Sequence, residues 1–521
     1  MEAKSVHGED RLSELPVHII HHILCQTDIN PKDAARTCVL SKRWYYCWTS
    51  RPILVLDQEL EPYTSTYMSW EEFVKLVDQS LRPHVEQNLR LEQFTLKCGW
   101  TFDHRPRQRD LAYHHIDRWI DLVVKLNVRV LKIQPRNINP YYSLPDAIFA
   151  AKELTILELY WCKFEFDIKT TKITTFSNLK ELFLWDVHIF EEQFQTLTSR
   201  CPFITTLSLS NIQGMNKLHV RGLVHLETLG VELCKFESVV VQAPNLRIFT
   251  NSQEFDPLPC KIKIMDAYNT LHTLILERSS ITEQQFQDIF SEHSNISELY
   301  LFSCNGLKNI EIVSEKLKTL TLVMLKNLEQ VKIQAPNLMK VHFEVEGHKM
   351  PFSSMDPFTL ETASLSFGDL DTSSHINLSH FIQKFNYSKG LMLAIFCKKS
   401  ENILIYEDPR EFVIPPSNEV QILIRPMLHL ASLINDLLNM YPKTMSILPS
   451  TNNKVLQVMP TLVQQTKTKT KCFYGQQELK KVSIDITKKE MDTPWHHWLK
   501  SMSLFDHVTT FMFKWKKKSS K

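Results

Sequence analysis

The chain has 521 residues, 43% of them hydrophobic and 23% charged, which is the composition of a folded protein. Its 60 lysines and arginines nearly balance 58 aspartates and glutamates, so the net charge of +2 provides no overall basic field for nucleic acid or an anionic membrane. One compact core usually stops growing near about 250 to 300 residues. Several domains or a repeat array are therefore expected.

The sequence carries none of the common signals for export, membrane insertion or cofactor binding. The stretch "MEAKSVHGEDRLSELP" has no basic region followed by an apolar core, and no run of about 18 apolar residues occurs later. The 11 cysteines are an odd number without CxxC pairs, which is typical of reduced thiols. Only 10 glycines and no GxGxxG or GxxxxGK[ST] argue against phosphate-binding loops. We expect no cofactor, no membrane or nucleic-acid partner, and a location in the nucleus and/or cytoplasm.

The segment "LPVHIIHHILC" at residues 15–25 predicts a short helix that begins near Pro16, because proline fits the first helical turn. At about 100° per residue, one face carries His18, His21, His22 and Cys25, and the other carries Ile19, Ile20, Ile23 and Leu24. A zinc site needs about four ligands that close around the ion, which one helix face supplies poorly. We therefore interpret the polar face as solvent-facing and predict no metal site.

Two further helices are predicted before residue 50. The stretch "NPKD" offers Asn30 as an N-cap and Pro31 as the first residue of a helix that reaches about Val39. Ser41 can cap a third helix, "SKRWYYCW", which places Trp44 and Trp48 one turn apart. Fifty residues bury too little surface to be robust alone. This module is therefore expected to need a partner surface.

Residues 8–52 resemble the F-box of plant proteins. The family pattern is roughly D-x-[IL]-S-x-LP-x-x-[IL]-[IL]-x-x-IL, followed by DA-x-R-T-x-x-LSKRW-x-x-W. It is matched by Asp10, Leu12, Ser13, Leu15, Pro16, Ile19, Ile20, Ile23, Leu24, Asp33, Ala34, Arg36, Thr37, Leu40, Ser41, Lys42, Arg43, Trp44 and Trp48. The resemblance implies docking on a Skp-type adaptor of a cullin-RING ubiquitin ligase. The adaptor-binding residues, which include the core of the module, are predicted to be Leu12, Leu15, Pro16, Ile19, Ile20, Ile23, Leu24, Leu40 and Trp44.

From residue 91, an L-x-x-L-x-L signature recurs at steps that are mostly 20 to 25 residues, with a degenerate copy near Leu246, and this is the period of leucine-rich repeats. Its copies include Leu91/Phe94/Leu96, Val128/Leu131/Ile133, Leu154/Leu157/Leu159, Leu179/Leu182/Leu184, Ile204/Leu207/Leu209, Leu226/Leu229/Val231, Leu271/Leu274/Leu276, Ile296/Leu299/Leu301, Leu317/Leu320/Leu322 and Leu338/Val341/Phe343. The end of each copy predicts a short strand with alternate residues buried. Stacked strands then predict a parallel sheet on the concave side of a curved solenoid.

Cysteines follow three of these strands, at Cys162, Cys234 and Cys304. A small buried group at this position can form a hydrogen bond with the backbone of the adjoining loop. We therefore predict that these thiols are structural and not nucleophilic.

The repeats come in two lengths. Copies of about 25 residues contain "FEEQFQTLTSRCP" and "TEQQFQDIFSEHS", which predict helices on the convex side, whereas copies of about 21 residues contain a second alternating strand such as "LKNIEI" or "LEQVKI". The two-strand form and its "QAPNL" at 242–246 and 334–338 resemble plant F-box proteins with leucine-rich repeats. The predicted fold class is α/β: a small three-helix F-box followed by a leucine-rich-repeat solenoid, with mixed helices and strands on the convex side.

The predicted domains are the F-box at 8–52, a linker and cap of the solenoid at 53–90, leucine-rich repeats at 91–369 and a last segment at 370–521. In the last segment, "LMLAIFC", "VQILIRP", "MSILPS", "LKKVSIDI" and "VTTFMFKW" predict strands, and "LSHFIQKF", "LHLASLINDLLNMY" and "PWHHWLKSM" predict helices. Either the solenoid continues with irregular copies, or a separate α+β domain follows.

Large aromatic side chains alternate with the buried leucines, at positions predicted to face the concave side. The predicted substrate-binding residues are Tyr160, Phe183, Trp185, Tyr300 and Phe302, although lateral stacking would also explain them. No local context positions a nucleophile or an acid–base pair, so no catalytic site and no enzyme are predicted. The predicted function is the substrate-recognition subunit of an SCF-type ligase that holds an unknown protein substrate. The alternative is a ligand sensor or scaffold whose F-box is not used for ubiquitination.

Overall fold

The computed structural model describes residues 14–25, 35–59, 67–99, 106–136, 141–166, 175–254, 258–345, 352–355, 359–368, 386–396, 419–425, 444–448, 473–474, 477–487 and 508–517. The chain divides into two compact units, Met1–Leu246 with Lys263–Ala267, and Arg247–Ile262 with Tyr268–Lys521. The fold class is α/β, as predicted, with a few helices and long parallel sheets. None of the helices in the described ranges is both long and apolar enough to span a bilayer.

The N-terminal module contains α1 (Val17–Leu24), the 3-10 helix η1 (Thr37–Val39) and α3 (Lys42–Thr49). Pro16 is the N-cap of α1, and the Ser41 side chain accepts a hydrogen bond from the Trp44 N–H over 3.3 Å, which confirms the predicted cap. Asn30 and Pro31 lie outside the described residues. The core of the module consists of Ile20, Leu24, Trp44 and Cys47, with Leu15, Ile23 and Trp48 packed against it.

The first unit continues as a stack of repeats. Its strands are β1 (Ile53–Asp57), β2 (Gln93–Gly99), β3 (Val130–Arg136), β4 (Tyr142–Ser143), β5 (Ile156–Tyr160), β6 (Cys162–Lys163), β7 (Glu181–Trp185), β8 (Thr206–Ser210), β9 (Lys217–Val220), β10 (Thr228–Glu232) and β11 (Ser238–Gln242). The order β1-β2-β3-β5-β7-β8-β10 forms one parallel sheet. Strands β9 and β11 pair in parallel in a second sheet, and β4 pairs with β6.

The register of the main sheet follows directly from the leucine pattern. Leu207 lies beside Leu182 on one side and beside Leu229 on the other, and all three side chains are fully buried. Alternate residues of each strand point into this interior, so every repeat buries its leucines against its two neighbours. The predicted strand positions in this unit are thereby confirmed.

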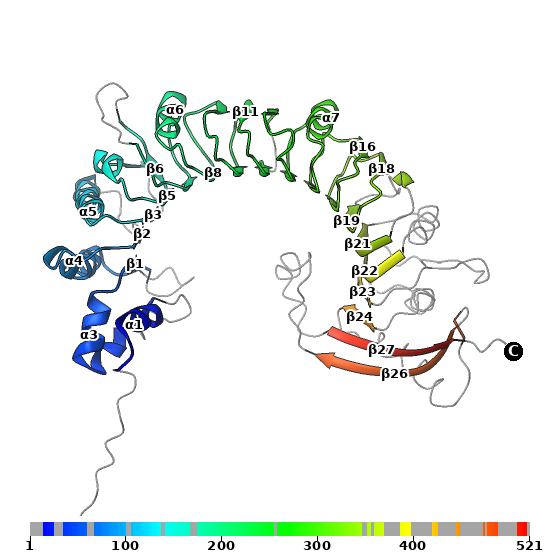
Figure 1. The fold of residues 1–521 in the computed structure, drawn as a ribbon, viewed down its shortest axis with the longest axis horizontal. Coiled ribbons are helices and arrows are strands. Elements are labelled where there is room, and N and C mark those ends of the chain that lie inside the picture. Colours follow the sequence, from blue (N-terminus) through cyan, green and yellow to red (C-terminus); the bar gives the residue numbers. More distant parts are fainter. Residues whose placement is uncertain are drawn as a thin grey trace, which may run out of the picture. The chain divides into compact units, whose positions relative to one another are not determined.

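Helices cover one side of the main sheet in the first unit (Figure 1). They are α4 (Trp70–Glu86), α5 (Pro106–Lys125), the 3-10 helix η2 (Asp146–Ala150) and α6 (Glu191–Ser199). Ser69 and Glu72 form a capping box at the start of α4. After α6 the helices of this side give way to strands β9 and β11, as the two repeat lengths predicted. Strand β1 pairs with β2, so the sheet begins within the segment that the sequence assigned to a linker and cap.

The second unit repeats the same plan. Its strands are β12 (Ile248–Ser252), β14 (Thr273–Glu277), β15 (Glu298–Phe302), β16 (Asn309–Val313), β17 (Thr319–Val323), β18 (Gln330–Gln334), β19 (Lys340–Val345), β20 (Phe352–Met355), β21 (Thr359–Gly368), β22 (Asn386–Phe396), β23 (Glu419–Arg425) and β24 (Thr444–Leu448), and β13 (Lys261–Met265) straddles the division. On the side of these repeats that lies opposite the main parallel strands are helix α7 (Glu283–Glu292) and strands β16, β18 and β20 (Figure 1). A helix therefore returns after the strand-type repeats of the first unit.

The parallel order β12-β14-β15-β17-β19-β21-β22-β23-β24 carries the repeat sheet beyond residue 370. Strand β27 (Val508–Lys517) then pairs antiparallel with β24 and with β26 (Gln477–Thr487), which also pairs with β25 (Phe473–Tyr474). The last segment thus contains both continuing parallel strands and an antiparallel end. Its three predicted helices fall outside the described residues.

Candidate functional site

The N-terminal module separates a closed core from an exposed apolar surface. Among the nine predicted adaptor-binding residues, Ile20, Leu24 and Trp44 are at most 6% exposed and form the core, so they support the surface from beneath and do not lie on it. Leu15 and Ile23 are half-buried against that core, and Pro16, Ile19 and Leu40 are exposed. Leu12 lies outside the described residues. The Arg43 guanidinium donates to the Leu15 carbonyl over 2.6 Å and ties α3 to the start of α1.

Val39 is an exposed apolar residue that the sequence reading did not assign to this surface. Its side chain is 87% exposed at the end of η1, and the next residue, Leu40, is 53% exposed. Ile19 and Val17 on α1 are 37% and 39% exposed. The side-chain pattern alone could not identify Val39, because the family motif leaves that position variable.

The polar face of α1 does not gather metal ligands. His18 and His22 are exposed, and His21 lies 3.4 Å from the Ser50 hydroxyl through its Nε2 atom. Burial raises the pKa of the Cys25 thiol. Within the described ranges, no group of three or more histidine, cysteine or acidic side chains is arranged to hold a metal ion.

The three cysteines that follow strands are buried and hydrogen-bonded to backbone carbonyls, which confirms their predicted structural role. The Cys162 thiol donates to the Tyr160 carbonyl over 2.9 Å, and the Cys304 thiol donates to the Leu276 carbonyl over 3.4 Å. Cys234 accepts from the Ile212 N–H at 3.5 Å. Burial raises the pKa of Cys234 and of Cys304 to about 12. Thiols that stay protonated in this way are poor nucleophiles.

In the first unit, the predicted substrate-binding aromatics lie on adjacent strands. The Tyr160 and Trp185 rings meet edge to face with centroids 4.7 Å apart, and Trp185 is 38% exposed. The Tyr160 hydroxyl donates to Glu158 Oε1 over 2.7 Å, and burial followed by this hydrogen bond raises the pKa of Tyr160. Phe183 is half-buried and lies beside Glu158 in the register. These rings therefore both stack on each other and present surface to solvent.

In the second unit, Tyr300 and Phe302 lie on the same face of β15. Their rings stack with centroids 6.4 Å apart and an interplanar angle of 11°, and both side chains are half-buried. The Tyr300 hydroxyl donates to Glu298 Oε2 over 3.4 Å. This pair is a smaller aromatic surface than the one formed by Tyr160, Phe183 and Trp185.

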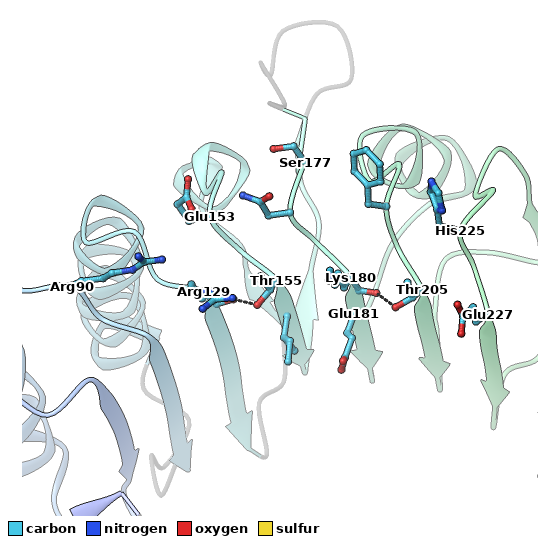
Figure 2. A pocket seen from close by; sticks show the side chains of 13 residues that line it. Arg90, Arg129, Glu153, Thr155, Ser177, Lys180, Glu181, Thr205, His225 and Glu227 are labelled. Atoms are coloured by element: carbon cyan, nitrogen blue, oxygen red, sulfur yellow. Dashed lines mark hydrogen bonds between the residues drawn. The ribbon is translucent and has the colours of Figure 1, made fainter. Parts of the chain in front are cut away.

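A hollow of about 850 Å³ lies where strands β5, β7, β8 and β10 begin (Figure 2). Two hydrogen bonds link neighbouring repeats at this hollow. Thr155 donates through Oγ1 to the Arg129 carbonyl over 3.1 Å, and Thr205 donates in the same way to the Lys180 carbonyl over 3.2 Å. The charged residues of its lining are balanced, with Arg90, Arg129 and Lys180 against Glu153, Glu181 and Glu227. Most of these side chains are exposed. This hollow therefore lacks the buried, converging polar groups that small-molecule sites use.

Comparison with known protein families matches three parts of the chain. An F-box domain model matches residues 12–56, and the leucine-rich repeats of the FBD-associated F-box protein At5g56370 match residues 116–270. The leucine-rich-repeat domain of At1g61320/AtMIF1 matches residues 259–387. The chain therefore combines an F-box with leucine-rich repeats. The apolar surface of the N-terminal module is thus the surface of an F-box.

Curated relatives of this F-box/leucine-rich-repeat protein come from Arabidopsis thaliana. It is 31% identical over 252 residues to the F-box/LRR-repeat protein At4g14103, covering 46% of this chain and 61% of that protein. It is 29% identical over 257 residues to the F-box/LRR-repeat protein At3g58900, covering 46% and 72%, and 29% identical over 209 residues to the F-box/FBD/LRR-repeat protein At1g13570, covering 40% and 45%. Across several of these relatives, the chain spans about half of the relative's length.

Proposed function

We propose that this F-box/leucine-rich-repeat protein is the substrate-recognition subunit of an SCF-type cullin-RING ubiquitin ligase. The F-box would dock on the Skp-type adaptor, and the repeats would hold a protein substrate. In this proposal the chain performs no chemistry itself, because holding a substrate lysine near the transfer machinery raises its effective concentration. We also propose a location in the nucleus and/or cytoplasm, which a fluorescent fusion would check.

The exposed apolar surface of the F-box is the observation that carries this proposal. Val39 and Leu40 are 87% and 53% exposed although the core beneath them is already closed. An apolar surface of this kind is expected to be covered by a partner. Covering one such side chain contributes about 1.5 to 3 kcal/mol.

A pull-down with a Skp-type adaptor tests the docking surface. The double variant Val39→Asp and Leu40→Asp should weaken adaptor binding by about two orders of magnitude, because it removes two apolar contacts and places charge in the interface. The matched control is Val224→Asp, which changes an apolar residue that is 49% exposed in the repeats and should leave binding unchanged. Retention of the adaptor by the double variant at wild-type affinity would refute the proposed surface, and a wild-type chain that binds no adaptor would refute the function.

The ligand-sensor alternative receives less support from the geometry. A receptor for an acidic small molecule would be expected to enclose it among several unbalanced basic groups. The side chains that line the hollow in Figure 2 are mostly exposed, and they include as many glutamates as arginines and lysines. Proteins that accumulate on the double variant inside cells, and not on the wild type, would be the substrates that the adaptor proposal requires.

A further inference from the structure

Aromatic rings gather beyond the ends of β5 and β7, next to the predicted substrate-binding residues. We call Tyr141, Trp161, His188 and Phe190 the aromatic rim. Tyr141 stacks on Trp161 with centroids 6.2 Å apart and an interplanar angle of 26°, and it lies 6.3 Å from His188. His188 meets Phe190 edge to face at 5.1 Å. These residues come from three separate loops, which only the stacking of the repeats brings together.

The aromatic rim joins the strand face at Trp185. The Trp161 N–H donates to the Trp185 carbonyl over 3.0 Å. Phe190 is 55% exposed and Trp185 is 38% exposed. Aromatic pairs in the core are far less exposed: Phe149 and Phe166, with ring centroids 4.9 Å apart, are only 2% and 6% exposed. The aromatic rim therefore offers ring surface to a partner.

A carboxylate lies within this aromatic surface. Asp186 directly follows Trp185, and its side chain accepts a hydrogen bond from the Asn211 amide. Burial and the nearby Asp186 charge raise the pKa of Tyr141, as expected when a phenol lies close to an anion. Among the described residues, Asp186 forms no ion pair, whereas Lys132 and Lys163 of the preceding repeats pair with Glu158 and Glu165.

The backbone at Trp161 follows a turn that other repeats share. Trp161 has φ 52°, and the equivalent residues of the next two repeats, Asp186 and Asn211, have φ 53° and 49°. Asn and Asp tolerate this left-handed conformation, whereas a tryptophan adopts it at a steric cost. Leu233 and Met324 adopt the same conformation after their own strands, so this turn belongs to the repeat and the aromatic ring is what distinguishes Trp161.

We infer that the aromatic rim and Asp186 bind an arginine or lysine side chain on an extended segment of a protein partner. Aromatic faces attract a cation within about 6 Å of the ring centroid, and Asp186 supplies the opposite charge. Glu232 lies two strands from Trp185 at the same level of the sheet, through Ser210, and adds negative charge along the path of such a segment. The inference rests on the proposed function only in naming that partner as the ligase substrate.

A peptide array tests this inference. It carries short unstructured peptides in pairs, and the two members of a pair differ only in having arginine or its uncharged analogue citrulline at one position. The full-length chain should retain the arginine member of a pair at least about tenfold better. Asp186→Asn should abolish most of this preference, because asparagine keeps an acceptor for Asn211 and tolerates the backbone but carries no charge. Trp161→Gly should weaken the binding itself by a similar factor, since glycine adopts the left-handed conformation freely.

Phe203→Ala is the matched control. Phe203 is 47% exposed and stacks on His225 at 5.4 Å, but it lies where β8 begins, at the opposite end of the strands. This variant should bind the peptides as the wild type does. Thermal unfolding of each variant reports whether it is folded.

Several outcomes would overturn the inference: equal retention of arginine and citrulline peptides, no retained peptide at all, or unchanged selectivity in folded Asp186→Asn and Trp161→Gly. The adaptor pull-down separates this inference from the proposed function. Arginine selectivity without adaptor binding would leave the inference standing and remove the proposed function. Adaptor binding without arginine selectivity would leave the proposed function standing and remove the inference.

Discussion

His84 is a fully buried histidine near the junction between the F-box and the first repeats. It lies on α4, and burial lowers its pKa, an effect offset in part by the backbone of Leu89 and reinforced by the charge of Arg51. Arg51 is itself 9% exposed, with its guanidinium 3.7 Å above the Trp48 ring and a hydrogen bond of 2.6 Å to the Trp48 carbonyl. Cationic and aromatic side chains thus fill the space that joins these two parts of the first unit.

Acid should destabilise the first unit through His84. Its pKa in the folded state is lower than in the unfolded state, where it is near about 6.5, so the unfolded state binds the proton more readily. The associated stability is complete above about pH 6.5 and is lost as the pH falls below that value. Urea unfolding at a series of pH values should show a smaller acid loss for His84→Met than for the wild type. His22→Met, at an exposed position of α1, is the control, and parallel curves for the wild type and His84→Met would contradict the prediction.

At the scale of one repeat, an asparagine in the loop before a strand links neighbouring copies. Asn245 donates through Nδ2 to the Val224 carbonyl over 2.7 Å, and Asn337 donates in the same way to Glu315 over 2.8 Å. Both asparagines belong to the "QAPNL" segments noted in the sequence. The recurrence of this short segment therefore has a physical cause, because each copy satisfies a carbonyl group of the copy before it.

Replacing this amide should weaken the second unit. Asn337→Asp keeps the size of the side chain but removes the N–H donor and places a carboxylate against the Glu315 carbonyl. The expected loss is about 1 to 2 kcal/mol of unfolding free energy, measured by chemical denaturation. Asn305→Asp is the control, because Asn305 contributes its carbonyl to such a link, as acceptor from Asn327. If both variants lose the same stability, charge and not the lost donor is responsible.

Strands and helices of the repeats were predictable because each one follows a local period. Leu207 and Leu209 alternate with polar residues and form β8, and the apolar spacing before "SRCP" forms α6. The exposure of Val39 was not predictable, since it depends on which neighbours close over the F-box core. The aromatic rim was also missed, because Tyr141 and His188 belong to no alternating pattern and meet only through β6, which pairs with β4 beside Tyr141 and forms a bridge with His188.

In the first unit as a whole, the F-box passes into the repeats almost without a break. Helix α3 ends at Thr49, and β1 begins at Ile53. The short connection and the buried Arg51 hold the exposed apolar surface of the F-box close to the first strand of the sheet. A substrate held farther along that sheet would consequently keep a defined distance from the adaptor.

The whole chain should associate with itself when the adaptor is absent. Its net charge of +2 gives little repulsion between copies, and Val39 and Leu40 expose apolar surface. The double variant Val39→Asp and Leu40→Asp should raise the monomeric fraction in size-exclusion chromatography with light scattering. Co-expression of the wild type with a Skp-type adaptor should have the same effect. An unchanged monomeric fraction in both experiments would show that another surface drives association.

The left-handed residue directly after a strand, described for Trp161, Asp186 and Asn211, recurs as Leu233 in the first unit and as Arg278, Ser303 and Met324 in the second. The side chains at this backbone position are thus chemically diverse and include an aromatic ring, a carboxylate, an amide, an aliphatic group, a guanidinium and a hydroxyl. If the repeats hold a substrate as proposed, a single substitution per copy would change the side chain presented at this position and leave the buried leucines unchanged. Duplicated genes that encode this fold would then acquire different substrate preferences through single amino-acid substitutions.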